Sequence, residues 1–243
     1  MLQIKFSHDK AIEVMKELET LYQKLLNNLI KELLYFIGNY EKHEYQQPIR
    51  QDNLIGFRNG VRTNLDNLNY DIEELINEVL DQELSMFEEH LTEIYLEIFE
   101  DKDKLDLALE NKWCGTNFRD VLLENTRQYI HKVKKELNAG LIRGDSKSQI
   151  KDTITKLTNS FTKKINTILT TETTYINNQA LLDKGLSQGY TKVRINEILD
   201  KRTCSLCQSK DGEEIPIKDV KFGVNTPPFH TNCRGSIEFI KNT

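Results

Sequence analysis

Three of the four cysteines and the last histidine of the chain lie in one short stretch near its C-terminal end. Cys204 and Cys207 form a C-x-x-C pair, and His230 and Cys233 form an H-x-x-C pair after a gap of twenty-two residues. Thiolate and imidazole ligands in two close pairs are typical of a tetrahedral zinc site. The spacing therefore predicts one zinc ion bound by these four residues.

The segment between the two pairs contains turn-forming residues, so the pairs can fold back on one another. These residues are Asp211-Gly212 and Pro227-Pro228. With all four ligand positions filled by protein, the zinc would be structural, because a catalytic zinc keeps an open position. Two alternatives stay open: reduced thiols packed beside Phe222 and Phe229, and a disulfide formed after cell lysis.

Length and composition favour a protein with no membrane partner. The chain has 243 residues, 38% of them hydrophobic, and no apolar run approaches the ~18 to 20 residues that span a bilayer. Its first residues, MLQIKFSHDK, lack the plan of a signal peptide. We therefore expect a reducing cytoplasm, where a C-x-x-C pair favours metal over a disulfide.

Charge is distributed unevenly along the chain, although the net charge is only −5. Residues 1–110 hold 24 acidic and 11 basic side chains, whereas residues 111–243 hold 14 acidic and 22 basic ones. A basic stretch over residues 127–164 could contact nucleic acid, an acidic protein surface such as the N-terminal half, or solvent alone. Its basic residues are Arg127, Lys132, Lys134, Lys135, Arg143, Lys147, Lys151, Lys156, Lys163 and Lys164.

Apolar residues recur every three or four positions over much of the chain, which predicts long helices. The expected helices cover residues 9–37, 65–98, 118–140 and 146–185, with a flexible loop at 38–63. His90 lies off the apolar stripe and is expected at the surface. Ser146 and Gln149 have the form of a capping box. Trp113 and Cys114 are expected to anchor a helix junction.

The pattern changes from helical to alternating after Gly189, which predicts short strands at 190–200, 213–217 and 235–240. The expected fold is mainly α, with a long-helix N-terminal bundle followed by a small α+β C-terminal module that carries a zinc-knuckle-like Cys/His site. Three domains are predicted: an acidic long-helix region at 1–110, a basic helical part at 111–189 and a small β/zinc-knuckle module at 190–243.

The last third of the chain resembles a known family in the order of its motifs. Thr170-Thr171-Glu172-Thr173 is followed by Gly189-Tyr190, then by D-x-R-T-C-x-x-C from Asp200, and finally by P-P-F-H-x-N-C-R from Pro227. This order resembles the phage Mu F-like minor head proteins, also called head morphogenesis proteins, over about residues 111–240. The matching residues outside the Cys/His set are Trp113, Glu172, Asp200, Thr203, Asp211, Gly212, Pro227, Pro228 and Arg234.

The resemblance implies a role in the head assembly of a tailed phage or prophage, without a defined enzymatic activity. Members act in the head interior or near the portal vertex, with the portal protein, scaffold and other head proteins as partners, and some travel with the DNA. Relatives commonly end the last motif as C-R-C, whereas Gly235 stands here at the final position. That difference leaves Cys204, Cys207, His230 and Cys233 as the four-ligand set.

Two other functions fit parts of the sequence. A zinc-knuckle nuclease would need a second cation site, for which the available carboxylates are Asp200, Asp211, Glu213 and Glu214. A non-specific DNA-binding protein would use the basic stretch together with Arg194, Lys201 and Arg202. Neither reading has a catalytic residue set or a recognition motif of its own.

Overall fold

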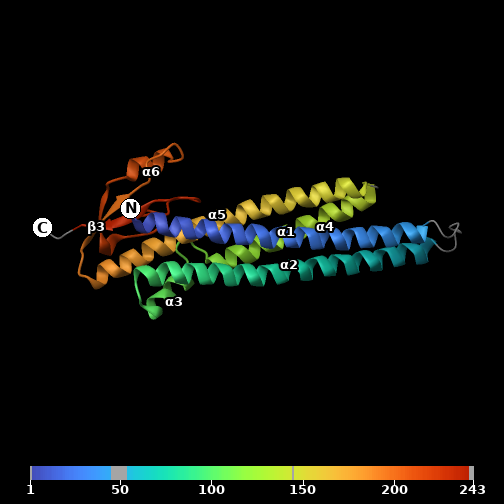
Figure 1. Ribbon diagram of the computed structural model, residues 1–243, viewed down its shortest axis with the longest axis horizontal. Coiled ribbons are helices and arrows are strands. Elements are labelled where there is room, and N and C mark those ends of the chain that lie inside the picture. The colour runs from blue at the N-terminus through green and yellow to red at the C-terminus, as the bar shows by residue number, and fades with distance from the viewer. Residues whose placement is uncertain (1, 45–53, 144, 241–243) are drawn as a thin grey trace. The chain divides into compact units, whose positions relative to one another are not determined.

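The structure is a computed structural model that describes residues 2–44, 54–143 and 145–240. Side chains are described for these residues except 2–8, 36–44, 54–65, 141 and 142. The mainly helical class with a small C-terminal sheet is confirmed (Figure 1). The elements are α1 (Leu2–Glu44), α2 (Leu54–Ile98), α3 (Lys102–Glu110), α4 (Phe118–Arg143), α5 (Lys147–Ser187), β1 (Lys192–Asn196), α6 (Ser205–Lys210), β2 (Glu214–Pro216), a 3-10 turn η2 (Ile217–Asp219) and β3 (Ser236–Phe239).

The first two helices are longer than the sequence predicted. Helix α1 continues to Glu44 and α2 begins at Leu54, so the predicted loop at 38–63 is wrong over 38–44 and 54–63. A single glycine inside a helix costs only ~1 kcal/mol relative to alanine, which the surrounding helix formers offset. The rest of that predicted loop, residues 45–53, lies outside the described residues.

The chain divides into two compact units, each assembled from segments that are far apart in sequence. Unit 1 contains Met1–Glu17, Glu83–Leu122 and Lys163–Thr243, and unit 2 contains Leu18–Gln82 and Leu123–Thr162. These units do not follow the predicted domains at 1–110, 111–189 and 190–243, whose boundaries stay a prediction. None of the described helices is long and apolar enough to cross a membrane.

An aromatic cluster holds the helices of unit 2 together, and a hydrogen bond beside the cluster and a cap at the start of α5 add polar contacts. The Phe161 ring stacks on Tyr129 at a centroid distance of 4.4 Å and meets the edge of Tyr22 at 5.4 Å. Tyr129 Oη also hydrogen-bonds with the buried Thr158 Oγ1 (2.7 Å). The predicted capping box starts α5, because Ser146 N donates to Gln149 Oε1 (2.8 Å) and Gln149 N donates to Ser146 Oγ (3.3 Å).

Helix α5 is rich in threonine yet runs without a break through Thr170 and Thr171. Threonine is unfavourable in helices because its branched side chain loses rotational freedom. Here its hydroxyls donate to the carbonyl four residues earlier, for example from Thr155 to Lys151 (2.8 Å) and from Thr171 to Thr167 (2.7 Å). The hydroxyl groups are thereby satisfied within one continuous helix.

Unit 1 places the C-terminal sheet against the end of α5. The strand order is β2-β1-β3, and both pairs are antiparallel, with Val193 opposite Ile215 and Ile195 opposite Ile237. Close packing requires Gly185 on α5, since a Cβ there would lie 2.2 Å from the Phe239 ring. The three predicted strands are therefore confirmed as short segments of one sheet.

His90 is buried in unit 1, so the prediction that it lies at the surface is wrong. Its side chain is 3% exposed, and Nε2 hydrogen-bonds with Thr173 Oγ1 (2.9 Å). Burial lowers the pKa of His90 to about 4, so the ring is neutral at neutral pH. The helix buries a broader face than its apolar stripe because α5 supplies a polar partner there.

Asn178 on α5 joins the helix to two distant parts of the C-terminal segment. Its amide Nδ2 donates to the carbonyls of Pro227 (3.3 Å) and Gly235 (3.0 Å), and its Oδ1 accepts from Ile237 N (3.0 Å). The side chain is fully buried. One amide therefore holds both the Pro227-Pro228 turn and the start of β3.

Replacing Asn178 with alanine should destabilise unit 1. The change leaves two carbonyls and one N–H without their partner in a buried site, and we expect a loss of about 2 to 4 kcal/mol in the free energy of unfolding. Chemical denaturation measures the loss, and hydrogen exchange at Ile237 should become faster. Asn159→Ala, at an exposed position of the same helix, is the control. Equal stability of the two variants would contradict the proposed anchor.

Candidate metal centre

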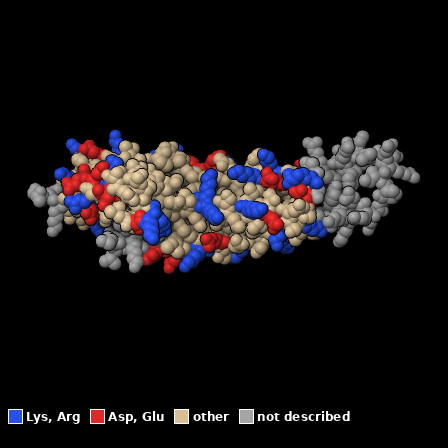
Figure 2. Space-filling view, turned by 90° about the horizontal axis from the view of Figure 1, so that it is seen from above, with Lys and Arg blue, Asp and Glu red and all other residues tan. Residues whose placement is uncertain are grey.

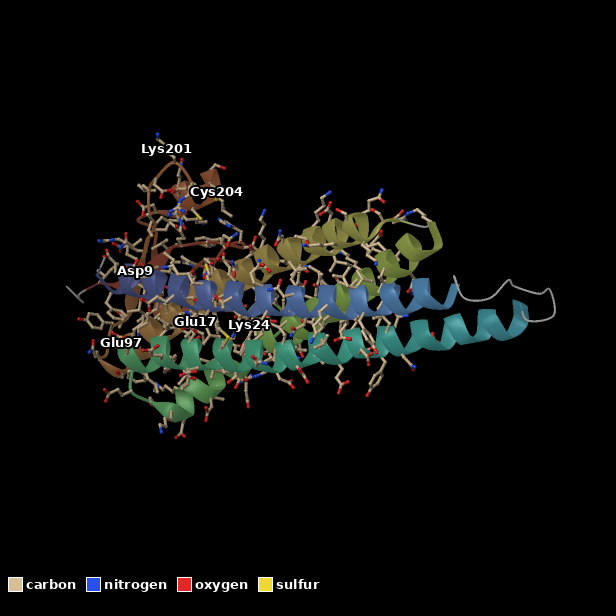
Figure 3. The ribbon with its side chains drawn as sticks, turned by 45° about the vertical axis from the view of Figure 1, so that its right-hand side comes forward. Asp9, Glu17, Lys24, Glu97, Lys201 and Cys204 are labelled. Carbon is tan, nitrogen blue, oxygen red and sulfur yellow. The ribbon has the colours of Figure 1, made fainter. Side chains whose placement is uncertain are left out.

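The C-x-x-C pair lies at the start of α6, a helix that the sequence did not predict. Cys204 is the N-cap of α6, and its Sγ accepts from Cys207 N (3.4 Å). An N–H group directed at a cysteine sulfur stabilises the thiolate form, and it lowers the pKa of Cys204. Lys201 and Cys204 lie on the loop that leads into this helix (Figure 3).

His230 comes from the turn after Pro227-Pro228 and reaches both members of the C-x-x-C pair. Its Nε2 lies 3.1 Å from Cys204 Sγ and 3.2 Å from Cys207 Sγ. Its Nδ1 lies 2.8 Å from the carbonyl oxygen of Thr231 and therefore carries the proton that is donated there. The lone pair of Nε2 then points to the sulfurs, which is the tautomer that a metal ligand needs.

Cys233 completes the predicted set from the other side of Cys207. The two sulfur atoms are 3.8 Å apart and do not form a disulfide. Two thiolates on one tetrahedral zinc are about 3.8 Å apart, given Zn–S bonds of about 2.3 Å. Cys204, His230 and Cys233 therefore all lie near Cys207, but in two groups: Cys204 and His230 form one with Cys207, and Cys233 belongs to another. These Cys/His groups can hold a metal ion.

The three cysteines of the site differ in how far they are exposed to solvent, and burial changes the pKa of Cys207. Cys207 and Cys233 are 3% and 1% exposed, whereas Cys204 is exposed. Burial raises the pKa of Cys207, with a further contribution from Cys233 beside it. A bound cation would offset this cost, because thiolates are the form that binds metal and the cation stabilises their charge.

Several residues of the family motif hold this loop region together. Asp200 accepts two hydrogen bonds from the Arg234 guanidinium (2.7 and 2.8 Å), which holds the pKa of that carboxyl well below its usual range. Asp200 N also donates to Thr203 Oγ1 (2.9 Å). The segment before Cys204 is thereby tied to the segment after Cys233 by a charge-assisted pair.

The turn between α6 and β2 uses the Asp211-Gly212 pair. Asp211 Oδ1 accepts from Glu197 N (2.9 Å), and Gly212 N donates to Ile195 O (2.9 Å). Gly212 has a φ of 80°, a conformation that glycine adopts at little cost. Both residues therefore position the end of β1 beside the cysteines.

One face of α5 contacts the loop that carries Cys233. Thr174 Oγ1 donates to Cys233 O (2.7 Å), and Thr171 Oγ1 accepts from Asn232 N (3.0 Å). Asn178 lies one turn after Thr174 on the same face. The three side chains together hold the H-x-x-C segment against the helix. None of the three was predicted as a site residue, although Thr171 lies in the T-T-E-T motif.

A buried carboxyl lies beside this face. Glu172 Oε2 accepts from Trp113 Nε1 (3.3 Å), and the Trp113 ring stacks on Tyr175 at 5.3 Å. Gly223 fits against the same indole, since a Cβ there would lie 3.3 Å from it. Burial raises the pKa of Glu172 to about 7. Trp113 thus packs at the junction between α3 and α4, as expected. Its hydrogen-bond partner, the Glu172 carboxyl, is partly protonated near neutral pH.

Cys114 takes no part in this cluster. Its thiol is exposed, and its nearest polar contact is the carbonyl of Thr116 at 3.9 Å. Partial burial raises the pKa of Cys114, which is the opposite of what a nucleophilic thiol requires.

The ten basic residues between Arg127 and Lys164 are placed on α4, on α5 and at their ends. Lys134 pairs with Glu73, which joins the basic stretch to the acidic N-terminal half inside unit 2. Arg143 pairs with Asp145 (2.7 Å). On the face shown in Figure 2, basic and acidic side chains lie beside one another. The role of these residues in contacts with DNA or an acidic partner stays a prediction.

Glu172→Gln should change how stability depends on pH. The raised pKa means that the folded state favours the protonated carboxyl, so its contribution is complete below about pH 4.5 and is lost as pH rises through about 7. Glutamine keeps an acceptor for Trp113 and cannot ionise. We expect the variant to be more stable than the wild type by about 1 to 3 kcal/mol near pH 8 and equal to it near pH 4.5.

Denaturation curves of both proteins across this pH range measure the effect. His90 contributes the opposite slope between about pH 4 and 6.5, so only the difference between variant and wild type isolates Glu172. The exposed Glu110→Gln serves as control. A difference that does not change with pH would contradict the assignment.

Comparison with known proteins gives one family. Residues 131–238 match the family model described as Phage Mu protein F like protein. This range covers the second half of α4, all of α5, β1, β2 and most of β3, including the four clustered Cys and His residues. No curated protein and no solved structure matched the chain. Residues 131–238 are therefore similar to the phage Mu protein F-like family, and this similarity suggests phage head morphogenesis and a place in the virion head.

Proposed function

We propose that this protein is a minor head protein of a tailed phage or prophage that acts by binding other head components near the portal or in the head interior. The family match carries this proposal. The family is structural and is not a known enzyme family. The portal protein is the first partner to test, followed by scaffold, other head proteins and packaged DNA.

The metal centre fits a structural role in this function. Its ion would be zinc, because three thiolates with one imidazole form the soft donor set that zinc prefers. Cys204, Cys207, His230 and Cys233 leave no open position for a reacting water. The ion would tie α6 to the H-x-x-C segment and stabilise a small module with few core residues.

The nuclease alternative loses support because its candidate carboxylates are occupied. Asp200 binds Arg234, Glu213 pairs with Lys210 (2.9 Å), and Glu214 pairs with Arg194 (2.9 Å). Asp211 accepts a backbone N–H instead. A second cation would have to displace these partners. Non-specific DNA contact by the basic stretch remains compatible with a head protein, and no geometry favours it as a separate function.

Removal of the metal should lower the thermal stability of the protein. Protein purified without chelator should contain one zinc per chain, and Cys207→Ser should lose the metal because this buried thiol is shared by both sides of the site. We expect the melting temperature to fall by about 5 to 10 °C after chelation or in the variant. Elemental analysis and thermal denaturation measure both effects. Cys114→Ser, a change of the remaining cysteine, should behave as wild type, and metal-free protein of unchanged stability would refute the zinc centre.

The role in head assembly is tested in the phage that encodes the chain. Interrupting its gene should leave tails intact and reduce the number of heads filled with DNA, which electron microscopy of lysates shows. The chain should be found in purified heads by mass spectrometry and should co-purify with the portal protein. Supplying the wild-type chain or Cys114→Ser in trans should restore the heads. Normal, infectious heads that lack the chain would overturn the proposal.

A further inference from the structure

Glu197 is a charged residue at a position that the sheet assigns to the core. It directly follows β1, where Val193 and Ile195 are buried and the residues between them are more exposed. Strand alternation therefore turns Glu197 toward the same buried side, and its side chain is only 7% exposed. A carboxylate in such a place costs free energy unless a cation or hydrogen-bond donors compensate for the lost water.

The neighbouring residues supply that compensation only in part, through the Cys207 thiol and the charges of His230 and Arg234. Within the part of the chain that the structure describes, Glu197 Oε1 is buried without a hydrogen-bond partner. The Arg234 guanidinium is directed to Asp200, with both hydrogen bonds at 2.8 Å or less. The contact with Asp211 uses the backbone N–H of Glu197 and does not involve its carboxylate. One buried carboxylate oxygen, Oε1, is therefore left for a further partner.

The Glu197 carboxylate lies beside Cys207 and Cys233, the two buried cysteines of the metal centre. A carboxylate oxygen of Glu197 and the sulfurs of Cys207 and Cys233 lie within 4.8 Å of one another. The Glu197 carboxylate also fills the space beside Gly235, where a Cβ would lie 2.2 Å from Oε1. Any larger residue at position 235 would push the carboxylate away from the cysteines.

We propose that Glu197 is a further ligand of the metal centre, able to complete the four-ligand set in place of the exposed Cys204. This inference rests on the metal centre proposed above. The donors form two triplets, Cys204–Cys207–His230 and Glu197–Cys207–Cys233, which share Cys207. Zinc accepts carboxylate oxygen at about 2.0 to 2.2 Å as well as sulfur at about 2.3 Å, and a structural site takes four of the five donors.

The burial of the donors shows which one the carboxylate can replace. Cys207 and Cys233 are buried, whereas Cys204 is exposed at the N-cap of α6. Water and competing ligands reach Cys204 first. Glu197 is placed on the inner side by β1 and Asp211, so its carboxylate remains near the ion when Cys204 does not bind.

A double-mutant cycle with cobalt(II) as the probe tests this role, with Cys204→Ser and Glu197→Gln as single and combined changes in the full chain. Chelator competition gives the affinity, and the thiolate-to-cobalt absorption reports the number of bound sulfurs. Cys204→Ser should still bind one cobalt, with weaker absorption. Glu197→Gln alone should weaken cobalt binding only a few-fold. In the Cys204→Ser background it should weaken binding more than about 100-fold, because there the change removes a direct ligand of the metal and not only a neighbour of the ligands.

Glu213→Gln, an exposed glutamate that pairs with Lys210, is the matched control and should change neither background. Circular dichroism of each metal-free variant separates lost ligation from lost folding. An equal effect of Glu197→Gln in both backgrounds, or no cobalt bound by Cys204→Ser, would overturn the role of Glu197 as a ligand. Either result would leave the proposed metal centre standing. A wild-type chain that binds no cobalt would overturn the metal centre and this inference together.

Discussion

The C-terminal module depends on the polar contacts that one face of α5 makes with it. Thr171, Thr174 and Asn178 lie about one turn apart and bind the backbone of the H-x-x-C segment, the Pro227-Pro228 turn and the start of β3. The three strands are short and bury few apolar residues, so these bonds must fix the segment in place. Thr171 donates to Thr167 O within the helix while its oxygen accepts from Asn232 N, so α5 stays a continuous helix while it presents this hydroxyl.

The same anchoring determines the geometry of the metal centre. Each side of the site comes from a different support: α6 orients the C-x-x-C pair, α5 holds the loop of His230 and Cys233, and β1 delivers Glu197. The Asp200–Arg234 pair closes the loop between them. With a metal bound, such a site would stabilise the fold and offer no open coordination position, which agrees with a family of structural head proteins. The binding surfaces that function requires would then lie on the helices.

The helices and the ligand set follow from local patterns in the sequence. Apolar spacing predicted the long helices, the capping box at Ser146 predicted the start of α5, and alternation predicted the strands. Cys204, Cys207, His230 and Cys233 were predicted from spacing alone, and the structure brings them together. The predicted loop at 38–63 was wrong over its described ends, because isolated glycines are weak signals against a long run of helix formers.

What the sequence determined by itself is therefore most of the helices and strands and the four candidate Cys/His ligands, since a 3.6-residue repeat and the spacing of two ligand pairs are properties of short segments. Only the tertiary structure decided which polar residues are buried. His90 is inside because Thr173 partners it, Asn178 because three backbone groups meet it, and Glu197 because β1 turns it toward Cys207 and Cys233. The physical reason is that a buried polar group needs a partner, and the partners of His90 and Asn178 come from positions 49 to 83 residues away, which no local pattern encodes.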